Sequence, residues 1–328
     1  MQKRKVRAIA LLSGGLDSIL AVKTILEQGI EVVGLSFITP FFGPKNAQKA
    51  AAKLNIPLIT KDITDEHFLI VKDPLYGYGR TMNPCIDCHA LMLKTAGKLM
   101  QDEGFDFIFT GEVLGERPMS QNQRALDIVA ETSGHKRYIL RPLSAKLLPP
   151  TEPELKGQVN RGKLLDIQGR SRKIQIKLAK EFGIKEYPNP AGGCLLTDPG
   201  FSKRLKDLLA YNQTPAETDL QLLKIGRHFR LSDTVKLIVG RDEAENESLE
   251  NFHMPSDFLL EMQDVPGPTG LLVGDKSSAV LEIAACICAS YSDAEPGSEC
   301  CVNLRNNKQA EAIKVRSNYR YRKENRIN

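Results

Sequence analysis

The sequence predicts an α/β fold: a doubly wound parallel sheet, followed by a helical segment and a smaller α+β domain at the carboxyl end. In residues 1 to about 145, short β-branched or aromatic runs alternate with segments of helical spacing. Strands that alternate with helices in this way pair in parallel through right-handed crossovers. Prolines in the stretch 141–154 mark the end of this region, and strand-like runs return only after about Thr218.

Each element is expected from its own local pattern. Strands are expected at 6–12, 30–37, 56–60 and 105–110, and helices at 18–29, 46–54 and 88–103. The clearest helices of the next segment are expected at 154–167 and 171–184, and strands of the last domain at 235–240 and 270–274. We therefore expect three parts, at 1–150, 151–215 and 216–328. Ligands of the first part are expected at the carboxyl ends of its strands.

Composition limits the classes of function. The 328 residues are 41% hydrophobic and 26% charged, and no continuous apolar stretch reaches about 18 residues, so neither a membrane span nor a membrane partner is expected. The apolar run 6–12 contains Arg7 and is too short for a secretory signal, which favours a cytoplasmic protein. The 7 cysteines of such a chain favour thiols or metal ligands over a disulfide framework.

The net charge of +5 is concentrated at the carboxyl end. Residues 314–328 carry six basic side chains against Glu324, which leaves 39 basic and 39 acidic residues in the rest of the chain. Tyr319 and Tyr321 alternate with arginines there, a composition suited to phosphate contact and base stacking. A solvated, frayed terminus has the same composition, so the tail alone leaves both interpretations open.

The stretch Ser13-Gly14-Gly15-Leu16-Asp17-Ser18 follows the first predicted strand and leads into a helix. Backbone N–H groups and the positive end of the helix then point at one place, and the glycines let an anion approach the backbone. This predicts a cradle for phosphate or pyrophosphate, with neither the Walker A pattern nor the dinucleotide pattern. Asp17, at the helix entry, is either a cap or a ligand of a Mg²⁺ ion that bridges phosphates.

This stretch resembles the PP-loop signature of the ATP-pyrophosphatase superfamily. The resemblance implies an adenine nucleotide alpha hydrolase-like fold and an enzyme that splits ATP between the α- and β-phosphates, adenylates a carbonyl-type oxygen and releases pyrophosphate. It also implies which residues hold ATP. These are Ser13, Gly14, Gly15, Asp17 and Ser18 of the loop, Ser36 and Phe37 at the end of the second strand, and Thr110 and Gly111 after the fourth.

Three cysteines indicate the chemical step after activation. The spacing of Cys85 and Cys88 lets two thiolates bind one metal centre, and Cys194 comes after glycines that can bring a third close. The pair alone is consistent with a zinc half-site or a redox pair. The three together resemble the cluster-dependent tRNA thiolases, relatives of 4-thiouridine and 2-thiouridine synthetases, in which three cysteines hold a [4Fe-4S] cluster. The resemblance implies that one iron stays open for the sulfide that attacks the adenylated uridine.

Other stretches resemble the 4-thiouridine branch and an RNA-binding family. The segment 110–121 is similar to that branch's T-G-E-x-x-G-x-x-x-S-Q stretch, which implies that Glu112, Ser120 and Gln121 line the site, and 141–143 is similar to its R-P-L. Ordinary helix capping explains the first segment equally well. The sequence from 235 onward resembles the RNA-binding domain of NFACT-type proteins. Gly240, Arg241 and Asn246 carry one of its segments, and Asp264, Pro266 and Gly267 the other.

The other cysteines and the histidines add no clear site. Cys286 and Cys288 lie in an apolar run and are expected to be buried as small hydrophobes. Adjacent cysteines such as Cys300 and Cys301 are poorly placed to share one site, although a sulfur relay stays open. Of the histidines, only His89, next to Cys88, is a candidate metal ligand.

The resulting hypothesis is an ATP-dependent tRNA uridine thiolase. Its catalytic residues are Asp17, Cys85, Cys88 and Cys194, its cofactors ATP, Mg²⁺ and a [4Fe-4S] cluster, and its partners tRNA and a sulfur source, either inorganic sulfide or a cysteine desulfurase. One alternative is an iron-free thiolase with a persulfide on Cys194. Another is a zinc-stabilised RNA-binding factor that uses ATP as a switch. The sequence leaves open the uridine, its thiolated position (2 or 4) and the oligomeric state, a homodimer included.

Overall fold

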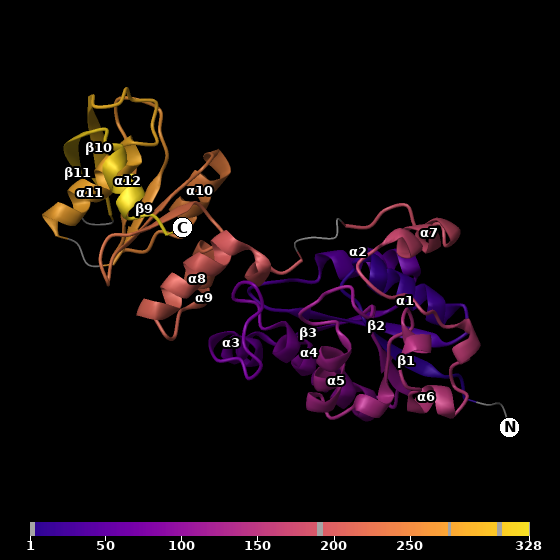
Figure 1. Ribbon diagram of the computed structural model, residues 1–328. Helices are drawn as coiled ribbons and strands as arrows, with labels where there is room; N and C mark the ends of the chain where they lie inside the picture. Colours follow the sequence, from indigo (N-terminus) through magenta and orange to yellow (C-terminus); the bar gives the residue numbers. More distant parts are fainter. Residues whose placement is uncertain (1–3, 189–192, 275–276, 307–309, 328) are drawn as a thin grey trace. The chain divides into compact units, whose positions relative to one another are not determined.

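A computed structural model describes residues 4–188, 193–274, 277–306 and 310–327. The chain forms two compact units, at 1–197 and 198–328 (Figure 1). The boundary lies inside the segment 151–215 that was expected to complete the first domain. Each unit is described by itself below.

A parallel sheet forms the centre of the first unit. Its strands lie in the order β3-β2-β1-β4-β5, and every pair is parallel. The strands are β1 (Arg7–Leu11), β2 (Glu31–Ile38), β3 (Leu58–Asp62), β4 (Phe107–Phe109) and β5 (Ile139–Leu140). The predicted doubly wound sheet is confirmed, with the first strand in the middle. The carboxyl ends of β1, β2 and β4 therefore meet at one edge.

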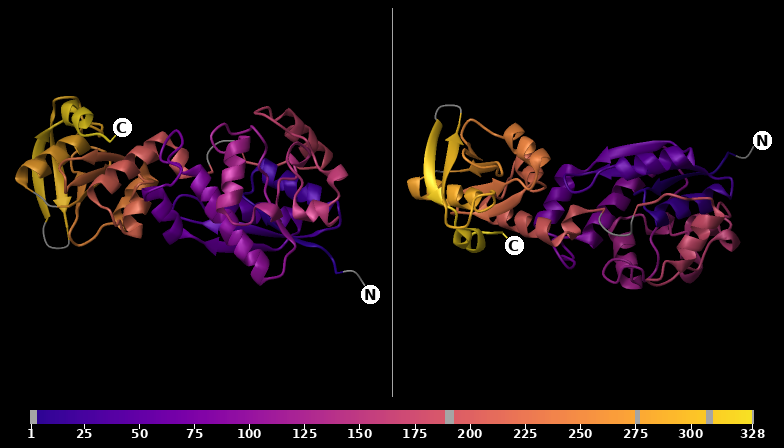
Figure 2. Two further views of the ribbon diagram at one scale, coloured as in Figure 1. Left: turned by 60° about the horizontal axis from the view of Figure 1, so that its bottom comes forward. Right: turned by 90° about the horizontal axis from the view of Figure 1, so that it is seen from above.

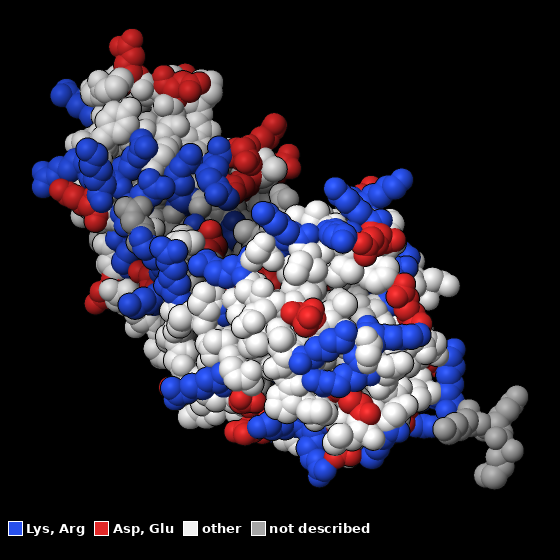
Figure 3. Space-filling view, turned by 45° about the vertical axis from the view of Figure 1, so that its right-hand side comes forward, with Lys and Arg blue, Asp and Glu red and all other residues white. Residues whose placement is uncertain are grey.

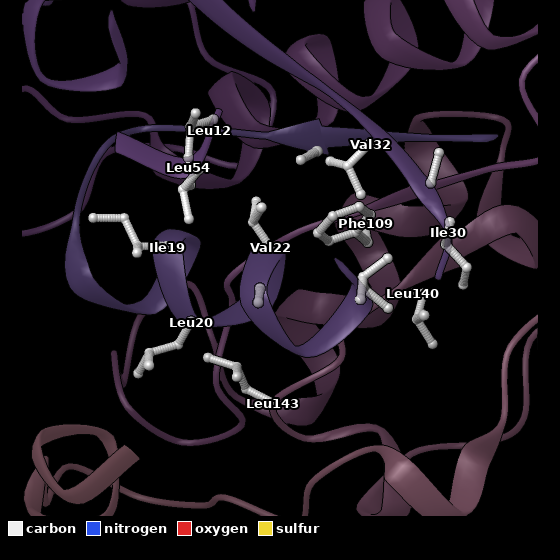
Figure 4. Packing of buried hydrophobic residues seen from close by; sticks show 14 of the residues in the cluster. Leu12, Ile19, Leu20, Val22, Ile30, Val32, Leu54, Phe109, Leu140 and Leu143 are labelled. Atoms are coloured by element: carbon white, nitrogen blue, oxygen red, sulfur yellow. The ribbon is translucent and has the colours of Figure 1, made fainter. Parts of the chain in front are cut away.

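Helices cover both faces of this sheet. The helices are α1 (Leu16–Leu26), α2 (Lys45–Leu54), α3 (Thr64–Lys72), α4 (Cys85–Asp102), α5 (Gln123–Thr132), α6 (Glu152–Leu155) and α7 (Lys173–Glu181), with 3-10 turns at Lys136–Tyr138, Ala145–Leu147, Arg161–Lys163 and Leu195–Thr197. One core cluster joins the sheet to α1, α2 and α7, and another joins it to α4 and α5. Figure 4 shows the first cluster, in which Val22 of α1 points toward Val32 and Phe109 of the sheet.

The prediction of a helix at 154–167 is wrong. Only α6 and one 3-10 turn form there. Gly157 adopts a left-handed conformation with φ of +67° right after α6, and Asn160 caps the 3-10 turn by accepting a hydrogen bond from the backbone N–H of Gly162 at 2.9 Å. The left-handed Gly157 ends α6, and the Asn160 cap starts a separate turn, so no continuous helix forms. The helix expected at 171–184 forms as α7.

The second unit is an α+β domain with an antiparallel sheet. The strand order is β11-β10-β8-β9-β7-β6, and every pair is antiparallel. The strands are β6 (Arg227–Arg230), β7 (Lys236–Val239), β8 (Phe258–Met262), β9 (Gly270–Val273), β10 (Glu299–Arg305) and β11 (Ala310–Arg316). The helices are α8 (Pro199–Tyr211), α9 (Glu217–Leu222), α10 (Glu243–Asn251), α11 (Ser278–Ala289) and α12 (Tyr319–Glu324). The colours of Figure 2 show that each sheet is built from its own part of the chain.

Candidate functional site

The loop after β1 presents backbone N–H groups at the start of α1. Gly15 precedes the helix, and no side chain caps it. The hydroxyl of Ser18 donates instead to the carbonyl of Gly15 at 2.8 Å, and the backbone N–H of Gly15 donates to Ser13 Oγ at 3.3 Å. The first N–H groups of an α-helix have no partner within the helix, so they remain available to an anion. This geometry suits the predicted phosphate cradle.

Two glycines let neighbouring segments approach this loop. Gly14 has a φ of +78°, and a Cβ built on it would lie 2.3 Å from the backbone of Asn46, near the start of α2. A Cβ on Gly111, which comes after β4, would lie 2.5 Å from the backbone nitrogen of Ser18. The ends of β1 and β4 are therefore in direct contact, and the structure brings the predicted Thr110 and Gly111 to the loop.

The residues predicted at the end of β2 are buried. Ser36 and Phe37 are 6% and 5% exposed. The side chain of Phe37 packs in the core cluster that faces α4 and α5. A nucleotide contact at Phe37 therefore rests on its backbone.

Asp17 lies in a cluster of charged side chains beside the loop. One of its carboxylate oxygens is 3.5 Å from Arg172 Nη2, and Arg172 Nε is 3.9 Å from a carboxylate oxygen of Glu116. Burial raises the pKa of Asp17, and the charge of Arg172 opposes that rise. The other carboxylate oxygen of Asp17 is buried without a hydrogen-bond partner in the described structure. Oxygen ligands of this kind fit a Mg²⁺ ion.

Cys85 and Cys88 occupy the first turn of α4. A spacing of three residues puts both on one side of a helix. Asn83 Nδ2 donates to the Cys85 sulfur at 3.1 Å, and Cys88 is buried. Burial raises the pKa of Cys88 well above its usual value, and negative charge on Cys194 or Cys85 would raise it further.

Two hydrogen bonds hold the segment of Cys194 to other parts of the first unit. The backbone N–H of Leu195 donates to the carbonyl of Phe41 at 3.0 Å, and Thr81 Oγ1 donates to the carbonyl of Leu196 at 2.6 Å. Burial raises the pKa of Cys194 to about 11, and negative charge on Cys85 contributes to the rise. The structure thus brings the three predicted cysteines into one electrostatic environment. Residues 189–192, part of the predicted glycine-containing loop, lie outside the described residues.

Arg117 connects the two halves of the candidate site. Its charge lowers the pKa of the Asp17 carboxylate, and it also lowers the pKa of the Cys194 thiol, although burial is the larger effect on both groups. The effect of a charge on a neighbouring group falls off with the distance between them. One guanidinium group therefore acts on both the loop after β1 and the third cysteine.

The three thiols have the chemistry of a cluster site. Within the described ranges, no group of three His, Cys, Asp or Glu side chains is placed to hold a metal ion. The donor set itself fits: thiolates bind iron in such clusters, and metal binding deprotonates thiols whose pKa is high. The cysteines are all free thiols, and charge on Cys85 and Cys194 raises the pKa of Cys88 as charge on Cys85 raises that of Cys194.

A buried ion pair lies next to the cysteines. Glu112 accepts a hydrogen bond from Arg141 Nε at 2.9 Å through Oε2, and its Oε1 lies 2.9 Å from His89 Nδ1. Burial would raise the pKa of Glu112, but the Arg141 charge and the His89 hydrogen bond outweigh it and lower the pKa to about 2. His89, the candidate metal ligand, is thus paired with a carboxylate. Ser120 and Gln121 are buried, at 3% and 8% exposure.

The segments that resemble the RNA-binding family are part of the fold of the second unit. Asn246 Oδ1 accepts from the backbone N–H of Thr269 at 3.1 Å, beside Gly240, where a Cβ would lie 2.1 Å from that oxygen. Asp264 Oδ2 accepts from the backbone N–H of Cys301 at 3.2 Å. These residues therefore connect strands to one another and to α10, and the tail forms β11 and α12.

Cys286 and Cys288 are buried on α11, as predicted, and burial raises the pKa of Cys288 to about 12. Cys300 is buried and Cys301 is half-buried on β10. Among the described helices, none has the length and apolar character that a bilayer crossing requires.

Sequence reasoning missed Arg117, Arg172 and Glu116. Glu116 and Arg117 occupy variable positions of the recognised stretch 110–121, and Arg172 reaches the loop from the start of α7. The sole signal was a cluster of basic residues at 170–173, in front of an amphipathic helix.

The fold and the loop define the first unit as a PP-loop nucleotide-binding domain, and the comparisons with known proteins agree. Residues 4–146 match the family model described as thiamine biosynthesis protein (ThiI), and residues 226–323 match the model described as NFACT protein RNA binding domain. The two matches confirm the predicted resemblance of the first part to PP-loop enzymes of the ThiI type and of the last part to the NFACT RNA-binding domain.

Curated relatives are similar over part of their length. A tRNA-specific 2-thiouridylase MnmA of Leifsonia xyli is 31% identical over 44% of this chain and 44% of its own length. One of Methylobacterium nodulans is 25% identical over 68% of this chain and 60% of its own. The chain thus spans less than two thirds of either relative. A solved 4-thiouridine synthetase–RNA complex with bound ATP is 21% identical over 56% of this chain and 54% of that one, with a TM-score of 0.36.

Proposed function

We propose that this protein is an ATP-dependent tRNA uridine thiolase. In this reaction a uridine oxygen attacks the α-phosphate of ATP, and pyrophosphate leaves. A sulfur nucleophile then attacks the uridine carbon that bears this oxygen, and the oxygen departs as part of AMP. The family matches and the names of the relatives support the class of reaction. The two-domain arrangement, a nucleotide domain followed by an RNA-binding domain, supports tRNA as the substrate.

The observation that carries the proposal is the electrostatic effect of Arg117 on two groups. Its charge acts on Asp17, in the loop proposed to bind ATP, and on Cys194, the third proposed sulfur-site cysteine. Activation and sulfur transfer have to take place at the same uridine carbon. A nucleotide loop and thiols in the field of one side chain satisfy that requirement.

The loop residues bind and orient the nucleotide. Backbone N–H groups of the α1 start would hold the phosphates, and Asp17, with its unpartnered oxygen, would hold a Mg²⁺ ion that supplies positive charge to them. Arg172 and Arg117 supply positive charge beside the pyrophosphate that leaves. Thr110 and Gly111 close the nucleotide site from β4.

Cys85, Cys88 and Cys194 would hold the [4Fe-4S] cluster. When bound with three protein ligands, such a cluster supplies an iron that can carry sulfide. The persulfide alternative needs a thiolate on Cys194, and burial opposes this by raising its pKa to about 11. Cluster ligation also needs deprotonated thiols, and a bound metal centre supplies the positive charge that deprotonates them.

Anaerobic purification followed by iron and acid-labile sulfide analysis tests the cofactor. We expect iron and sulfide in the native chain and their loss in Cys85→Ser, while Cys301→Ser, a half-buried thiol outside the site, retains both. A colourless, iron-free and fully active protein would leave the persulfide route in place of the cluster.

The reaction is tested with ATP, tRNA and sulfide supplied together. Formation of AMP, pyrophosphate and a thionucleoside is expected, and mass spectrometry of the nucleosides identifies position 2 or 4. A parallel reaction with a cysteine desulfurase and cysteine identifies the sulfur source. Absence of AMP and pyrophosphate would support the zinc-stabilised, ATP-switched RNA-binding factor instead.

A further inference from the structure

Two hollows meet on the surface of the second unit. One, of about 630 Å³, lies between α8, β6 and the end of the chain, and the other, of about 590 Å³, lies over α12. Arg326 lines both, so they form one continuous surface. We call it the basic groove, after the cations that line it: Lys203, Lys206, Arg230, Arg322, Lys323 and Arg326. Figure 3 shows Lys and Arg side chains gathered on the face of this unit that it displays.

The carboxylates of the basic groove are already neutralised. Asp207 accepts two hydrogen bonds from Arg230, at 3.2 and 2.6 Å, and Glu324 accepts one from Arg320 at 2.8 Å. Five of the six cations that line the groove are therefore not neutralised by these carboxylates. In the described part of the chain, no carboxylate lies within ion-pair distance of Lys203, Lys206, Arg322, Lys323 or Arg326.

Buried groups beside the groove respond to this excess of positive charge. Burial lowers the pKa of Lys236 to about 8, and the charges of Arg230 and Arg204 lower it further against the opposing effect of Asp207. Arg204, on α8, has a buried Nε with no hydrogen-bond partner among the described residues. The electrostatic potential here is therefore positive, and a bound anion would reduce the repulsion among these cations.

Exposed tyrosines line the same surface. The Arg230 guanidinium lies 4.4 Å from the ring centre of Tyr211, which is 51% exposed. Tyr319 is 44% exposed and lies 5.5 Å from Arg322, which also stacks on Tyr291 at 4.0 Å. Flat, exposed rings beside cations are suited to unpaired bases above a phosphate backbone. A hollow lined in this way fits a single strand of RNA better than it fits a membrane surface.

We propose that the basic groove binds the phosphate backbone of tRNA, with Tyr211 and Tyr319 stacked on unpaired bases, and that α8 is part of this RNA site. The proposal rests on the proposed function for its substrate and extends it in one respect. Residues 199–211 precede the segment 226–323 that matches the RNA-binding family, so the match itself does not assign them. The RNA site is thus larger than the family segment.

The test compares two double variants of the full chain. K203Q/K206Q removes two charges from α8, and K314Q/R316Q removes two from β11, which lies at the opposite edge of the sheet from β6. Fluorescence anisotropy with labelled tRNA, without ATP or a sulfur source, measures binding over a range of salt concentrations. We expect K203Q/K206Q to weaken binding about tenfold and to reduce the salt slope by about 2, one for each phosphate contact, and K314Q/R316Q to bind like the native chain.

A second pair of variants separates the contribution of base stacking from that of charge. Tyr211→Leu is expected to weaken binding of an unstructured oligonucleotide about tenfold and of an RNA duplex much less, whereas Tyr211→Phe keeps the ring and the affinity. Thermal unfolding confirms that each variant is folded. An unchanged salt slope in K203Q/K206Q, or an equal loss in K314Q/R316Q, would overturn the proposal. The proposal would also be overturned if K203Q/K206Q bound tRNA like the native chain but lost binding to phosphatidylserine vesicles.

The outcome is separable from the proposed function. Binding is measured without chemistry, so a chain that forms no thionucleoside can still show the predicted groove. Conversely, full thiolation activity with tRNA binding that is insensitive to K203Q/K206Q would reject the groove and leave the enzyme assignment in place.

Discussion

Glu112 and Arg141 form a buried ion pair, 2.9 Å apart, that joins the segment after β4 to the segment after β5. The two side chains are 7% and 8% exposed. Arg141 Nη2 also donates to the carbonyl of Leu126 on α5 at 3.2 Å. The pair thus connects two strand ends to the helix layer that includes the cysteine helix.

Removing one partner of this pair is expected to destabilise the first unit. Arg141→Met leaves the Glu112 carboxylate buried without its countercharge, which costs about 3–5 kcal/mol of unfolding free energy. Urea unfolding measures the change. The double variant E112Q/R141M is expected to recover most of the loss, because neither charge is left. An R141M loss below about 1 kcal/mol would show that water reaches the pair.

The same carboxylate predicts acid sensitivity. The folded pKa of Glu112 is about 2, below the usual 4.5, so its contribution is complete above about pH 4.5 and is lost as the pH falls toward 2. The shift corresponds to about 3 kcal/mol. The stability difference between the native chain and Glu112→Gln, from urea midpoints, should shrink by most of this amount from pH 5 to 2.5. A constant difference would contradict the assignment.

His67 predicts a second, separate pH window. It is fully buried between Phe41 and Phe42, and burial lowers its pKa to about 4 from the usual 6.5. Because the fold excludes the charged form, stability is complete above about pH 6.5 and falls by up to about 3 kcal/mol as the pH drops toward 4. His67→Leu should remove this part of the pH dependence in thermal unfolding at pH 7.5 and 4.5. An unchanged slope would indicate that the ring is hydrated.

Gly111 predicts a steric limit at the nucleotide site. In Gly111→Ala the new methyl would overlap the backbone of Asp17 and Ser18, so β4 and α1 must separate. We expect ATP binding, measured by calorimetry, to weaken roughly 10- to 100-fold. Gly43→Ala is the matched control, since nothing lies within 4 Å of its Cβ position. Equal affinities for the two variants would place the nucleotide elsewhere.

The sequence predicts the first sheet well because its strands are locally encoded. Apolar runs lie within β1, β2 and β4 and at the start of β3, and the glycines of the loop mark the first crossover. The two-residue strand β5 is too short to produce such a run. The helix expected at 154–167 fails because periodicity does not register the left-handed conformation of Gly157.

The candidate site was only partly predictable for a different reason. Ser13 to Ser18 and the cysteine pair are contiguous motifs, so sequence alone finds them. Arg117 and Arg172 act from other segments through long side chains, and their relation to Asp17 depends on how those segments pack. The pairing of His89 with Glu112 is equally a product of tertiary structure.

The segment of Cys194 ends at the boundary between the two units, because the first unit ends at Thr197. The hydrogen bonds of Leu195 to Phe41 and of Thr81 to Leu196 lie between the thiol and that boundary. They tie the chain to Phe41 and Thr81 on the boundary side of the thiol, so that a displacement of the chain beyond Thr197 is resisted there before it reaches the sulfur. The backbone next to the third thiol is thus held by the first unit itself.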